Sequence, residues 1–566
     1  MKTACFNLVD EPWLPVTLVE DFPRRTERGP LPRVSLREAF EYGDKIVDLR
    51  CYPHERIALL RLLVCIAQRA LNGPEDENDW KRCGERLASE AVAYLDKRKD
   101  CFNLLGNGPR FLQAHGNGKP GEMTVFRLTL IDKDTSVLFD AQVRPGAKME
   151  APELAVSLVT FQSFAAGGKT GGSELSPMGR KTKAGTIKDE PQSGEAALCR
   201  EAGALHAFIL GANLSETIHA NLLCRSQIVP PASWPKSAIP VWEYRKTHLK
   251  DFPDANIGAS YLGRLVPLAR AVWLTEDQAS AEIANGIRYG VFADSKDAKT
   301  GKVKPGTGIR ELTTSIQPDR LDPTKSKLVS ASAGDGVPKA AWRELHSIAV
   351  LRRSATRGGP VALQHLRTIG SQDAILWCGA LVGPRAKVGD VIESVFRLPI
   401  QFLEDADAAR EDDPRWRPGP NQIYRQGVDF ANFWASKLQW AVQKYHESLK
   451  DSLKQNANRG RSVKNQAATR YWTALEQQAE RVLLHGVALN SGKYSTAGDA
   501  WMAKSPWGHE VRKAAHDAYE FSCPHGTPRQ LRAYAAGLAV LRREDRPKST
   551  SSDGAEEDGP NDGGEG

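Results

Sequence analysis

The chain has 566 residues, of which 41% are hydrophobic and 26% are charged, as in a folded globular protein of roughly two to four domains. No apolar run approaches the ~20 residues of a membrane-spanning helix, and the first residues lack a signal-peptide pattern, so we expect a cytoplasmic protein without membrane contact. The net charge is +8, and the acidic last residues, 551–566, contain no Lys or Arg. The basic body suits contact with a polyanion, although charge of this size also serves solubility alone.

The N-terminal part predicts short strands and helices. Residues 13–16 are apolar, but one proline precedes them and another lies among them, which indicates an edge strand or a turn. Ser35 with Glu38 three residues later forms a capping-box pattern and predicts a helix start. Residues 53–70 predict a helix, because apolar residues recur on one helical face and Pro53 suits a first turn.

The middle of the chain predicts a mixed region. Residues 101–150 alternate short apolar runs with Gly, Pro and Asp, which favours loops and short strands. Residues 164–196 form a long polar stretch, which in a compact protein is usually functional or disordered. We predict a return to helix over residues 198–223. Strands are predicted at 259–262 and 270–274.

The C-terminal part predicts helices only. Four amphipathic segments are separated by short breaks, the first at 458–460, and they lie near residues 421–454, 465–490, 506–522 and 528–544. We therefore predict an α+β fold with a large mixed α/β N-terminal domain followed by a C-terminal four-helix bundle. The predicted boundaries are residues 1–400 for the mixed domain, 401–546 for the bundle and 547–566 for a disordered acidic tail.

A glycine-rich basic loop, residues 167–172, is the first candidate site. It resembles the end of a phosphate-binding P-loop, but the first glycine of that motif is replaced by Ser163. Glycines would let backbone amides approach a groove or phosphate, and nearby cations would follow the nucleic-acid backbone. A solvated loop is the competing interpretation. The candidate residues are Gly167, Gly168 and Lys169, with Arg180, Lys181 and Lys183 as phosphate contacts.

A polar turn around Gln372 is the second candidate site. It separates strand-like residues 366–369 from 374–377, which predicts a hairpin tip. A protruding glutamine can insert beside a base pair and offer both a donor and an acceptor, whereas an ordinary surface turn is the plainer interpretation. The site residues are Ser371, Gln372 and Asp373. Arg352 and Arg353 precede them and could contact phosphates or form surface ion pairs.

The sequence predicts no metal, cofactor or catalytic centre. His206 and His219 lie thirteen residues apart without a cysteine pair, and Asp132 and Asp134 lack the glycine and terminal glutamate of a calcium loop. Hydrolase, metalloprotease and kinase signatures are absent from the sequence. We expect a non-enzymatic protein. A metal-dependent nuclease subunit and a general nucleic-acid-binding scaffold remain as alternatives.

Several of these segments together resemble the large subunit of the type I-E CRISPR surveillance complex Cascade, the CasA family. The resemblance covers most of the chain. It is carried by the opening Phe6-Asn7-Leu8-Val9-Asp10-Glu11-Pro12-Trp13-Leu14-Pro15-Val16, by Phe102 with Arg110-Phe111-Leu112-Gln113, by the loop at 167–172, by the segment 371–376 and by the helices over 421–544.

This resemblance implies a role in antiviral defence. The glycine loop would approach the minor groove of the protospacer-adjacent motif (PAM), and Gln372 would open the neighbouring duplex to start an R-loop. The helices would support the displaced strand and the docking of the helicase–nuclease. Expected partners are the guide RNA, double-stranded target DNA and the other Cascade subunits. A further loop would reach the guide RNA and the target through Asp134, Thr135, Ser136, Val137, Leu138 and Phe139.

Overall fold

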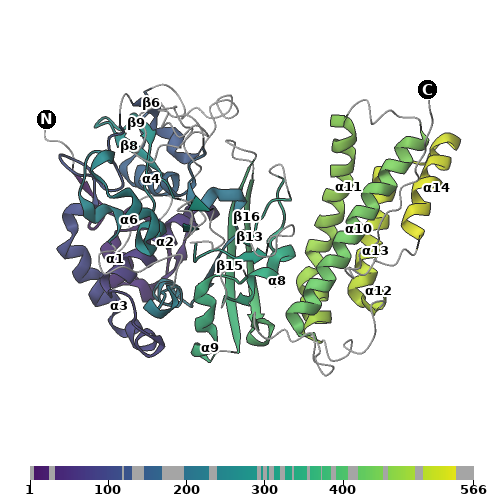
Figure 1. The fold of residues 1–566 in the computed structure, drawn as a ribbon, viewed down its shortest axis with the longest axis horizontal. Helices are drawn as coiled ribbons and strands as arrows, with labels where there is room; N and C mark the ends of the chain where they lie inside the picture. Colours follow the sequence, from purple (N-terminus) through teal and green to yellow (C-terminus); the bar gives the residue numbers. More distant parts are fainter. Residues whose placement is uncertain are drawn as a thin grey trace, which may run out of the picture. The chain divides into compact units, whose positions relative to one another are not determined.

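Figure 1 shows the fold of the chain in a computed structural model. The structure describes residues 5–23, 32–117, 120–130, 146–167, 197–228, 239–289, 295–296, 303–304, 311–318, 326–333, 337–352, 357–370, 372–383, 390–405, 418–449, 457–490 and 501–543. Helices and strands are mixed through the first four hundred residues, and only helices follow residue 418 in the described ranges. The predicted mixture of helix and sheet is therefore confirmed, and the predicted acidic tail over 547–566 lies outside the described residues.

The chain divides into two compact units. One comprises residues 1–425 and 488–495, and the other comprises residues 426–487 and 496–566. The sequence predicts a boundary near residue 400, whereas the division falls at residue 425, inside helix α10 (Pro420–Ser448). The first turn of α10 belongs to the first unit, where the Tyr424 hydroxyl donates to the carbonyl of Trp342 over 2.9 Å.

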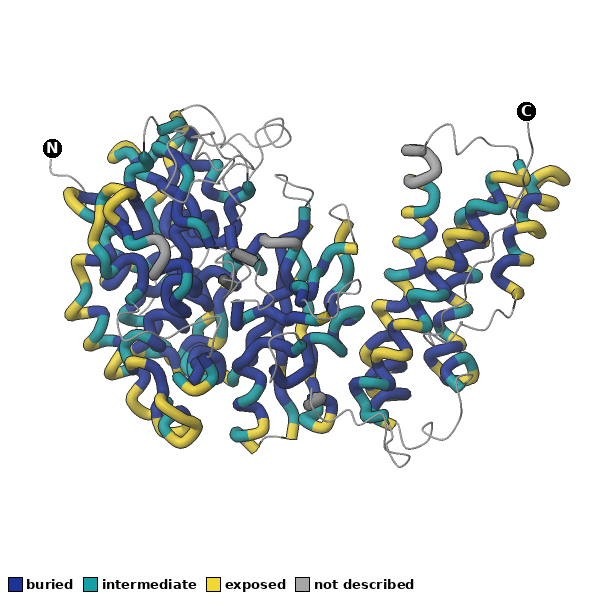
Figure 2. The backbone as a smooth tube through the Cα atoms, viewed as in Figure 1, coloured by how far each residue is buried: buried dark blue, intermediate teal, exposed yellow. Residues whose placement is uncertain are grey.

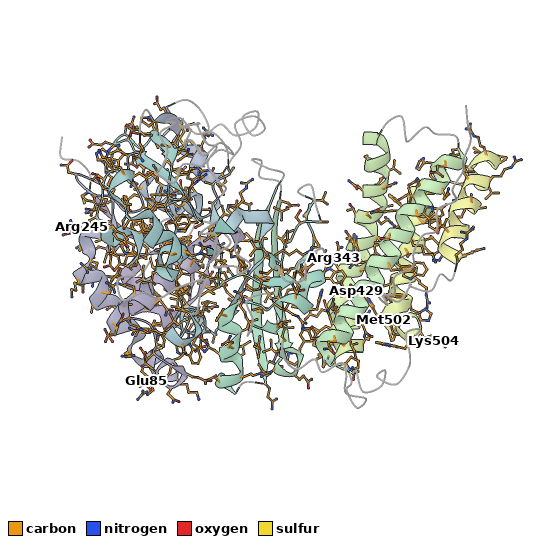
Figure 3. The ribbon with its side chains drawn as sticks, in the orientation of Figure 1. Glu85, Arg245, Arg343, Asp429, Met502 and Lys504 are labelled. Carbon is orange, nitrogen blue, oxygen red and sulfur yellow. The ribbon has the colours of Figure 1, made fainter. Side chains whose placement is uncertain are left out.

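The first unit is built around two buried helices. Helix α2 (Pro53–Ala70) is buried at every position from Arg56 to Gln68, and α4 (Ala151–Phe164) is buried from Leu154 onward. Figure 2 shows this core as dark blue tube. Helix α3 (Glu77–Lys97) is amphipathic, with exposed residues such as Glu85, labelled in Figure 3, opposite its buried face. Because α2 and α4 have apolar side chains on all their faces, other parts of the unit must pack against every face, so both helices lie at the centre of the first unit.

Local sequence patterns predict several helix boundaries correctly. Ser35 caps α1 (Leu36–Glu41) in the predicted capping box with Glu38, and the predicted helix over 53–70 is confirmed. The other helices of the first unit are α5 (Leu214–Ala220), α6 (Asp254–Ala259), α7 (Tyr261–Leu265), α8 (Leu345–Ile348) and α9 (His365–Ile369), with 3-10 turns η1 (Gly43–Lys45), η2 (Lys99–Phe102), η3 (Val125–Thr129), η5 (Leu198–Gly203), η6 (Arg225–Gln227), η7 (Val241–Tyr244), η8 (Leu249–Asp251), η9 (Ala341–Glu344), η10 (Val361–Gln364) and η11 (Ile400–Phe402).

The strands of the described residues form seven small sheets. Three of these have three strands, in the orders β16-β15-β7, β3-β2-β4 and β6-β9-β8, and the pairs are β1-β5, β10-β11, β12-β13 and β14-β17. The strands are β1 (Phe6–Asn7), β2 (Leu14–Leu18), β3 (Arg33–Val34), β4 (Ile46–Leu49), β5 (Asn103–Leu105), β6 (Gly121–Thr124), β7 (His206–Leu210), β8 (Arg270–Leu274), β9 (Ser280–Asn285), β10 (Ser295–Lys296), β11 (Val303–Lys304), β12 (Ile316–Pro318), β13 (Ser326–Leu328), β14 (Val350–Leu351), β15 (Asp373–Val382), β16 (Asp390–Pro399) and β17 (Glu404–Asp405).

Strand β15 is the long central strand of its sheet. It pairs antiparallel with β16 along its whole length, from Asp373 opposite Pro399 to Val382 opposite Asp390. On its other side, β15 pairs antiparallel with β7, where Gly379 lies opposite His206. From Leu376 to its end β15 is buried, because it has a strand on each side and helix α2 contacts it.

Three predicted segments have a different structure. Residues 259–262, predicted as a strand, contain the end of α6 and the start of α7, where the Ser260 side chain caps α7. Residues 198–223, predicted as a helix, contain η5, strand β7 and α5. Residues 366–369, predicted as a strand, lie in helix α9. Short apolar runs suit either structure, and in each case packing in the folded protein decides between them. The predicted strand over 270–274 is confirmed as β8.

The second unit is helical. It contains most of α10, then α11 (Ala457–Gln478), the π-helical segment η12 (Ala479–Ala488), α12 (Trp501–Lys504), α13 (Pro506–Ser522) and α14 (Pro528–Arg542). The predicted break at 458–460 is wrong, because α11 already begins at Ala457. Aromatic donors join the helices: Tyr471 and Trp507 donate to carbonyls of α10 at 2.8 and 2.9 Å, and Tyr519 donates to a carbonyl of α14 at 2.9 Å. None of the described helices has the length and apolarity that crossing a membrane requires.

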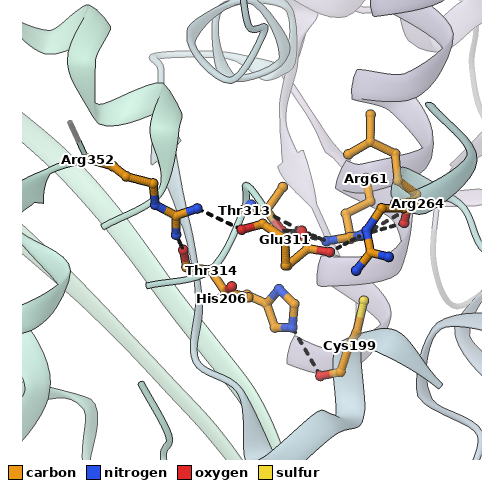
Figure 4. A network of polar contacts seen from close by, with 9 residues as sticks. Arg61, Cys199, His206, Arg264, Glu311, Thr313, Thr314 and Arg352 are labelled. Carbon is orange, nitrogen blue, oxygen red and sulfur yellow. Dashed lines mark hydrogen bonds and ion pairs between the residues drawn. The ribbon is translucent and has the colours of Figure 1, made fainter. Parts of the chain in front are cut away.

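A buried ion pair fixes α2 within the first unit (Figure 4). The Arg61 guanidinium donates to both carboxylate oxygens of Glu311, at 3.0 and 3.3 Å, and to the carbonyls of Leu265 and Arg264 at 2.9 and 2.6 Å. Burial opposes the ionisation of Glu311, but the charges of Arg61 and Arg264 outweigh it and hold the pKa of Glu311 well below its usual range. The pair thus joins segments about 250 residues apart in the sequence.

We predict that Glu311→Gln destabilises the chain by about 3–5 kcal/mol at pH 7, because the variant leaves a buried guanidinium without its counter-charge. The contribution of the ion pair is complete above pH 4.5, the ordinary pKa, and is lost as the pH falls toward the lowered pKa, so the difference from wild type shrinks in acid. Urea denaturation followed by tryptophan fluorescence measures both effects. Glu153→Gln, which breaks the exposed pair with Arg33, is the control and should cost less than about 1 kcal/mol.

Candidate nucleic-acid interface

Of the residues predicted to form the nucleic-acid interface, the structure describes four: Gly167, Arg352, Gln372 and Asp373. The remaining candidates lie outside the described residues. They are Gly168, Lys169, Arg180, Lys181, Lys183, Arg353, Ser371 and the predicted guide-RNA loop of Asp134, Thr135, Ser136, Val137, Leu138 and Phe139. The candidate interface is therefore described from these four residues and the residues that contact them.

The described residues on either side of the glycine-rich segment are hydrogen-bonded to each other. Helix α4 ends at Phe164, and the next carbonyl, of Ala165, accepts a hydrogen bond from the Ala197 amide over 2.8 Å. The described residues that flank 168–196 therefore lie side by side.

Hydrogen bonds of Gln162 and Arg270 fix the end of α4 and the residues that follow it, up to Ala166. The buried Gln162 amide donates to the carbonyls of Leu112 and Arg270, at 3.1 and 2.8 Å, and accepts from the Arg270 amide at 2.9 Å. The Arg270 guanidinium in turn donates to the carbonyl of Ala166, next to Gly167. Burial lowers the pKa of Arg270 to about 10, so this side chain stays charged at neutral pH.

Gln372 lies on a turn between a helix and a strand. The predicted hairpin tip is wrong, because α9 precedes the turn and β15 follows it. Gly370 ends α9 in the left-handed region, with φ of 68°, where a residue with a side chain would be strained. The Gln372 carbonyl accepts from the Ile400 amide at 2.9 Å, whereas the Gln372 side chain is exposed. The main chain is thus held and the amide group is presented to solvent.

An arginine on the neighbouring strand β16 also lies beside the turn, and the sequence analysis did not identify it. The Arg397 Nε and Nη2 atoms of β16 lie 3.1 and 3.0 Å from one carboxylate oxygen of Asp373, and the Arg397 side chain is 73% exposed. Exposed Ile375 and Val395 lie on the same sheet. Alternation in residues 393–397 could have shown that Arg397 faces outward with Val395. Only the strand register places Arg397 beside Asp373, and one sequence does not give that register.

Arg352 is buried, which corrects its prediction as a surface phosphate contact or ion-pair residue. Its guanidinium donates to the carbonyl of Glu311 at 2.7 Å and to the carbonyl of Thr314. Burial lowers the pKa of Arg352 to about 10. The side chain occupies the core network of Figure 4 and is directed away from the solvent that a phosphate would approach from.

The two candidate elements are connected through β15. Phe164, at the end of α4, packs edge-on against the His206 ring with centroids 6.2 Å apart, and His206 of β7 lies opposite Gly379 of β15. Gly379 is six residues from Asp373 along the strand, a span of roughly 20 Å at the rise of a β-strand. The root of the glycine loop and the Gln372 turn are thus positioned by the same strand. Within the described ranges, no group of three or more His, Cys, Asp or Glu residues could hold a metal ion.

Comparison with known proteins places this fold among CRISPR-associated proteins. Residues 7–518 match the family described as CRISPR-associated protein Cse1, and the chain belongs to that family. The CRISPR-associated protein CasA/Cse1 of Thermus thermophilus is 27% identical over 422 residues, which cover 70% of this chain and 72% of the relative.

Solved structures show the same fold over nearly the whole chain. The crystal structure of Thermus thermophilus CasA has a TM-score of 0.67 at 20% identity and covers 95% of this chain and 98% of its own. Thermobifida fusca Cse1 has a TM-score of 0.64 at 17% identity, with 95% and 97% covered. A chain of a CRISPR RNA-guided surveillance complex has a TM-score of 0.59 at 15% identity, with 95% and 99% covered.

We predict that Gln162→Leu loosens the root of the glycine loop. The substitution removes three hydrogen bonds and leaves buried backbone groups unpaired, so the free energy of unfolding should fall by at least about 3 kcal/mol. Hydrogen exchange should also become faster at the Arg270 amide. Gln477→Leu, at an exposed position of α11, is the matched control and should leave both quantities near wild type. Unchanged exchange at Arg270 in Gln162→Leu would contradict this account of the anchor.

Proposed function

We propose that this chain is the non-catalytic large subunit of a CRISPR RNA-guided surveillance complex, and that it recognises the PAM in double-stranded DNA and helps to open the duplex. Membership of the Cse1 family supports the assignment, and so does the likeness in fold, over 95% of this chain, to a subunit of such a complex. In an RNA-guided complex the guide supplies sequence specificity by base pairing, so the protein needs to read only a short duplex element and begin the unwinding.

The observation that carries the proposal is the exposed Gln372 side chain on a fixed main chain. Opening a base step costs a few kcal/mol, which the inserted group must offset through new contacts. A glutamine amide offers both donors and an acceptor to the separated base edges. Because Gly370 and the Ile400 amide already define the turn, little ordering of the main chain remains to be done when DNA binds.

The glycine loop supplies the PAM contact in this proposal. Gly167, Gly168 and Lys169 would enter the minor groove, where the pattern of donors and acceptors distinguishes base pairs poorly, so a permissive PAM is expected. Arg180 and Lys181 and Lys183 would add sequence-independent phosphate contacts. The hydrogen bond between the Ala197 amide and the Ala165 carbonyl, which joins the described residues on either side of this segment, supports the proposal.

Arg397 joins the proposed interface as a phosphate contact. Its side chain is exposed, lies beside the Gln372 turn and forms its ion pair with the partly exposed Asp373, an arrangement that a phosphate can replace at little cost. Asp373 would then hold the guanidinium in place before DNA arrives. The pairing of β15 and β16 keeps this cation at a fixed distance from Gln372.

The second unit would serve as the docking platform. We propose that α10, α11, α13 and α14 form a four-helix bundle that supports the displaced strand and receives the helicase–nuclease. The donor bonds of Tyr471, Trp507 and Tyr519 across these helices support a rigid assembly. The loop over 134–139 would reach the guide RNA and target DNA, as the sequence resemblance implies.

We predict that Gln372→Ala slows duplex opening by the reconstituted complex by roughly 10- to 100-fold, or about 1.4–2.8 kcal/mol, because the amide contacts to the opened bases are lost. R-loop formation is followed on targets with an intact or a scrambled PAM. Gln401→Ala, which removes another exposed glutamine near the same sheet, is the control and should act like wild type. PAM-dependent opening at the wild-type rate in Gln372→Ala would refute the proposed role. Equal binding of both targets by wild type would favour a general nucleic-acid scaffold instead.

A further inference from the structure

Three stacked rings connect helices α3, α5 and α9. The Trp80 ring of α3 lies between the rings of His219 and His365, with centroids 4.4 and 4.1 Å away and interplanar angles of 16° and 4°. Trp80 and His365 are buried, and His219 is half-buried. Such near-parallel packing of three rings fixes the separation of the helices that carry them.

Hydrogen bonds to the main chain hold both outer rings. The Nε2 atom of His219 lies 2.8 Å from the carbonyl oxygen of Trp80, and the Nε2 atom of His365 lies 2.8 Å from the carbonyl oxygen of Leu222. A carbonyl only accepts, so the protonated Nε2 is the donor in each case. Burial lowers the pKa of His365 to about 4, which keeps this ring neutral at physiological pH.

His365 is the first residue of α9, the helix that leads into the Gln372 turn. A helix of five residues is too short to be stable by itself, so its position depends on tertiary anchors. The described anchors at its start are the His365 ring, the buried side chain of Leu366 and the preceding turn η10, whose apolar residues are buried and whose Gln364 side-chain amide donates to the carbonyl of Arg352 at 2.6 Å. On the far side of the turn, the Ile400 amide holds the Gln372 carbonyl.

We infer that the His219–Trp80–His365 stack is a positioning device that sets where Gln372 meets the duplex. The inference rests on the proposed function, because it assigns the three rings a role in the duplex opening that Gln372 performs. Trp80 and the histidines do not touch DNA in this arrangement. They act through α9, whose start they fix against α3 and α5.

The test uses two substitutions at His365 that separate the ring from its hydrogen bond. His365→Gln keeps an N–H donor for the Leu222 carbonyl but removes the ring, whereas His365→Phe keeps a stacking ring but removes the donor. Each is assembled into the reconstituted complex with guide RNA. R-loop formation is then timed on a fully paired target and on a target whose first base pairs beside the PAM are mismatched and therefore already open.

We expect His365→Gln to open the paired target at least roughly tenfold more slowly than wild type, since small displacements from a productive geometry act on this scale. On the pre-opened target it should match wild type, because no wedge is needed there. His365→Phe should match wild type on both targets. This pattern cannot arise from a general loss of stability, which would slow both targets.

Two outcomes would overturn the inference. If His365→Gln opens the paired target at the wild-type rate, or is slowed equally on both targets, the stack serves the fold alone. Gln372→Ala, measured in parallel, separates this failure from failure of the proposed function. A Gln372→Ala complex that is slow only on the paired target upholds the wedge while the stack is rejected, whereas one that opens both targets at wild-type rates overturns the wedge and the stack together.

Discussion

The antiparallel pairing of β15 with β7 and β16 is the constraint on which the candidate interface depends. Through β7 it ties the strand to His206 and to the end of α4, from which the glycine loop departs. Through β16 it brings Arg397 to Asp373 at the start of the strand. A shift of one residue in the register of β16 against β15 would turn the β16 side chains to the opposite face and separate Arg397 from Asp373.

Buried polar anchors give this sheet fixed surroundings. Arg61 and Glu311 join the central helix to a segment far away in the sequence, and Gln162 fixes the loop root through three backbone contacts. Each anchor is costly to bury unpaired, so each specifies one arrangement of the segments it joins. In the proposed function, the main chain of Gln372 is held while its side chain is exposed and free to contact DNA.

The sequence predicts what local interactions decide. Ser35 with Glu38 identifies the start of α1, and Pro53 with its apolar face identifies α2, because capping and helical periodicity act over a few residues. Gln372 and Gly167 are singled out by their turn-forming and glycine-rich surroundings. Residues 259–262 and 366–369 are mispredicted, because short apolar runs take the structure that their tertiary neighbours impose. From the sequence, Arg352 is predicted to be a surface cation. Its burial depends on the carbonyls of Glu311 and Thr314, which only the fold brings beside it.

The central claim, that this subunit opens the duplex beside the PAM, is tested most directly by measuring the unstacking of the bases there. A target duplex with a fluorescent base analogue, 2-aminopurine, in the first step beside the PAM reports unstacking as a rise in fluorescence. The account predicts a rise when the complex contains this chain and the PAM is intact, and little change when either the chain is omitted or the PAM is scrambled. An equal rise from a complex that lacks this chain would contradict the claim that this subunit opens the duplex.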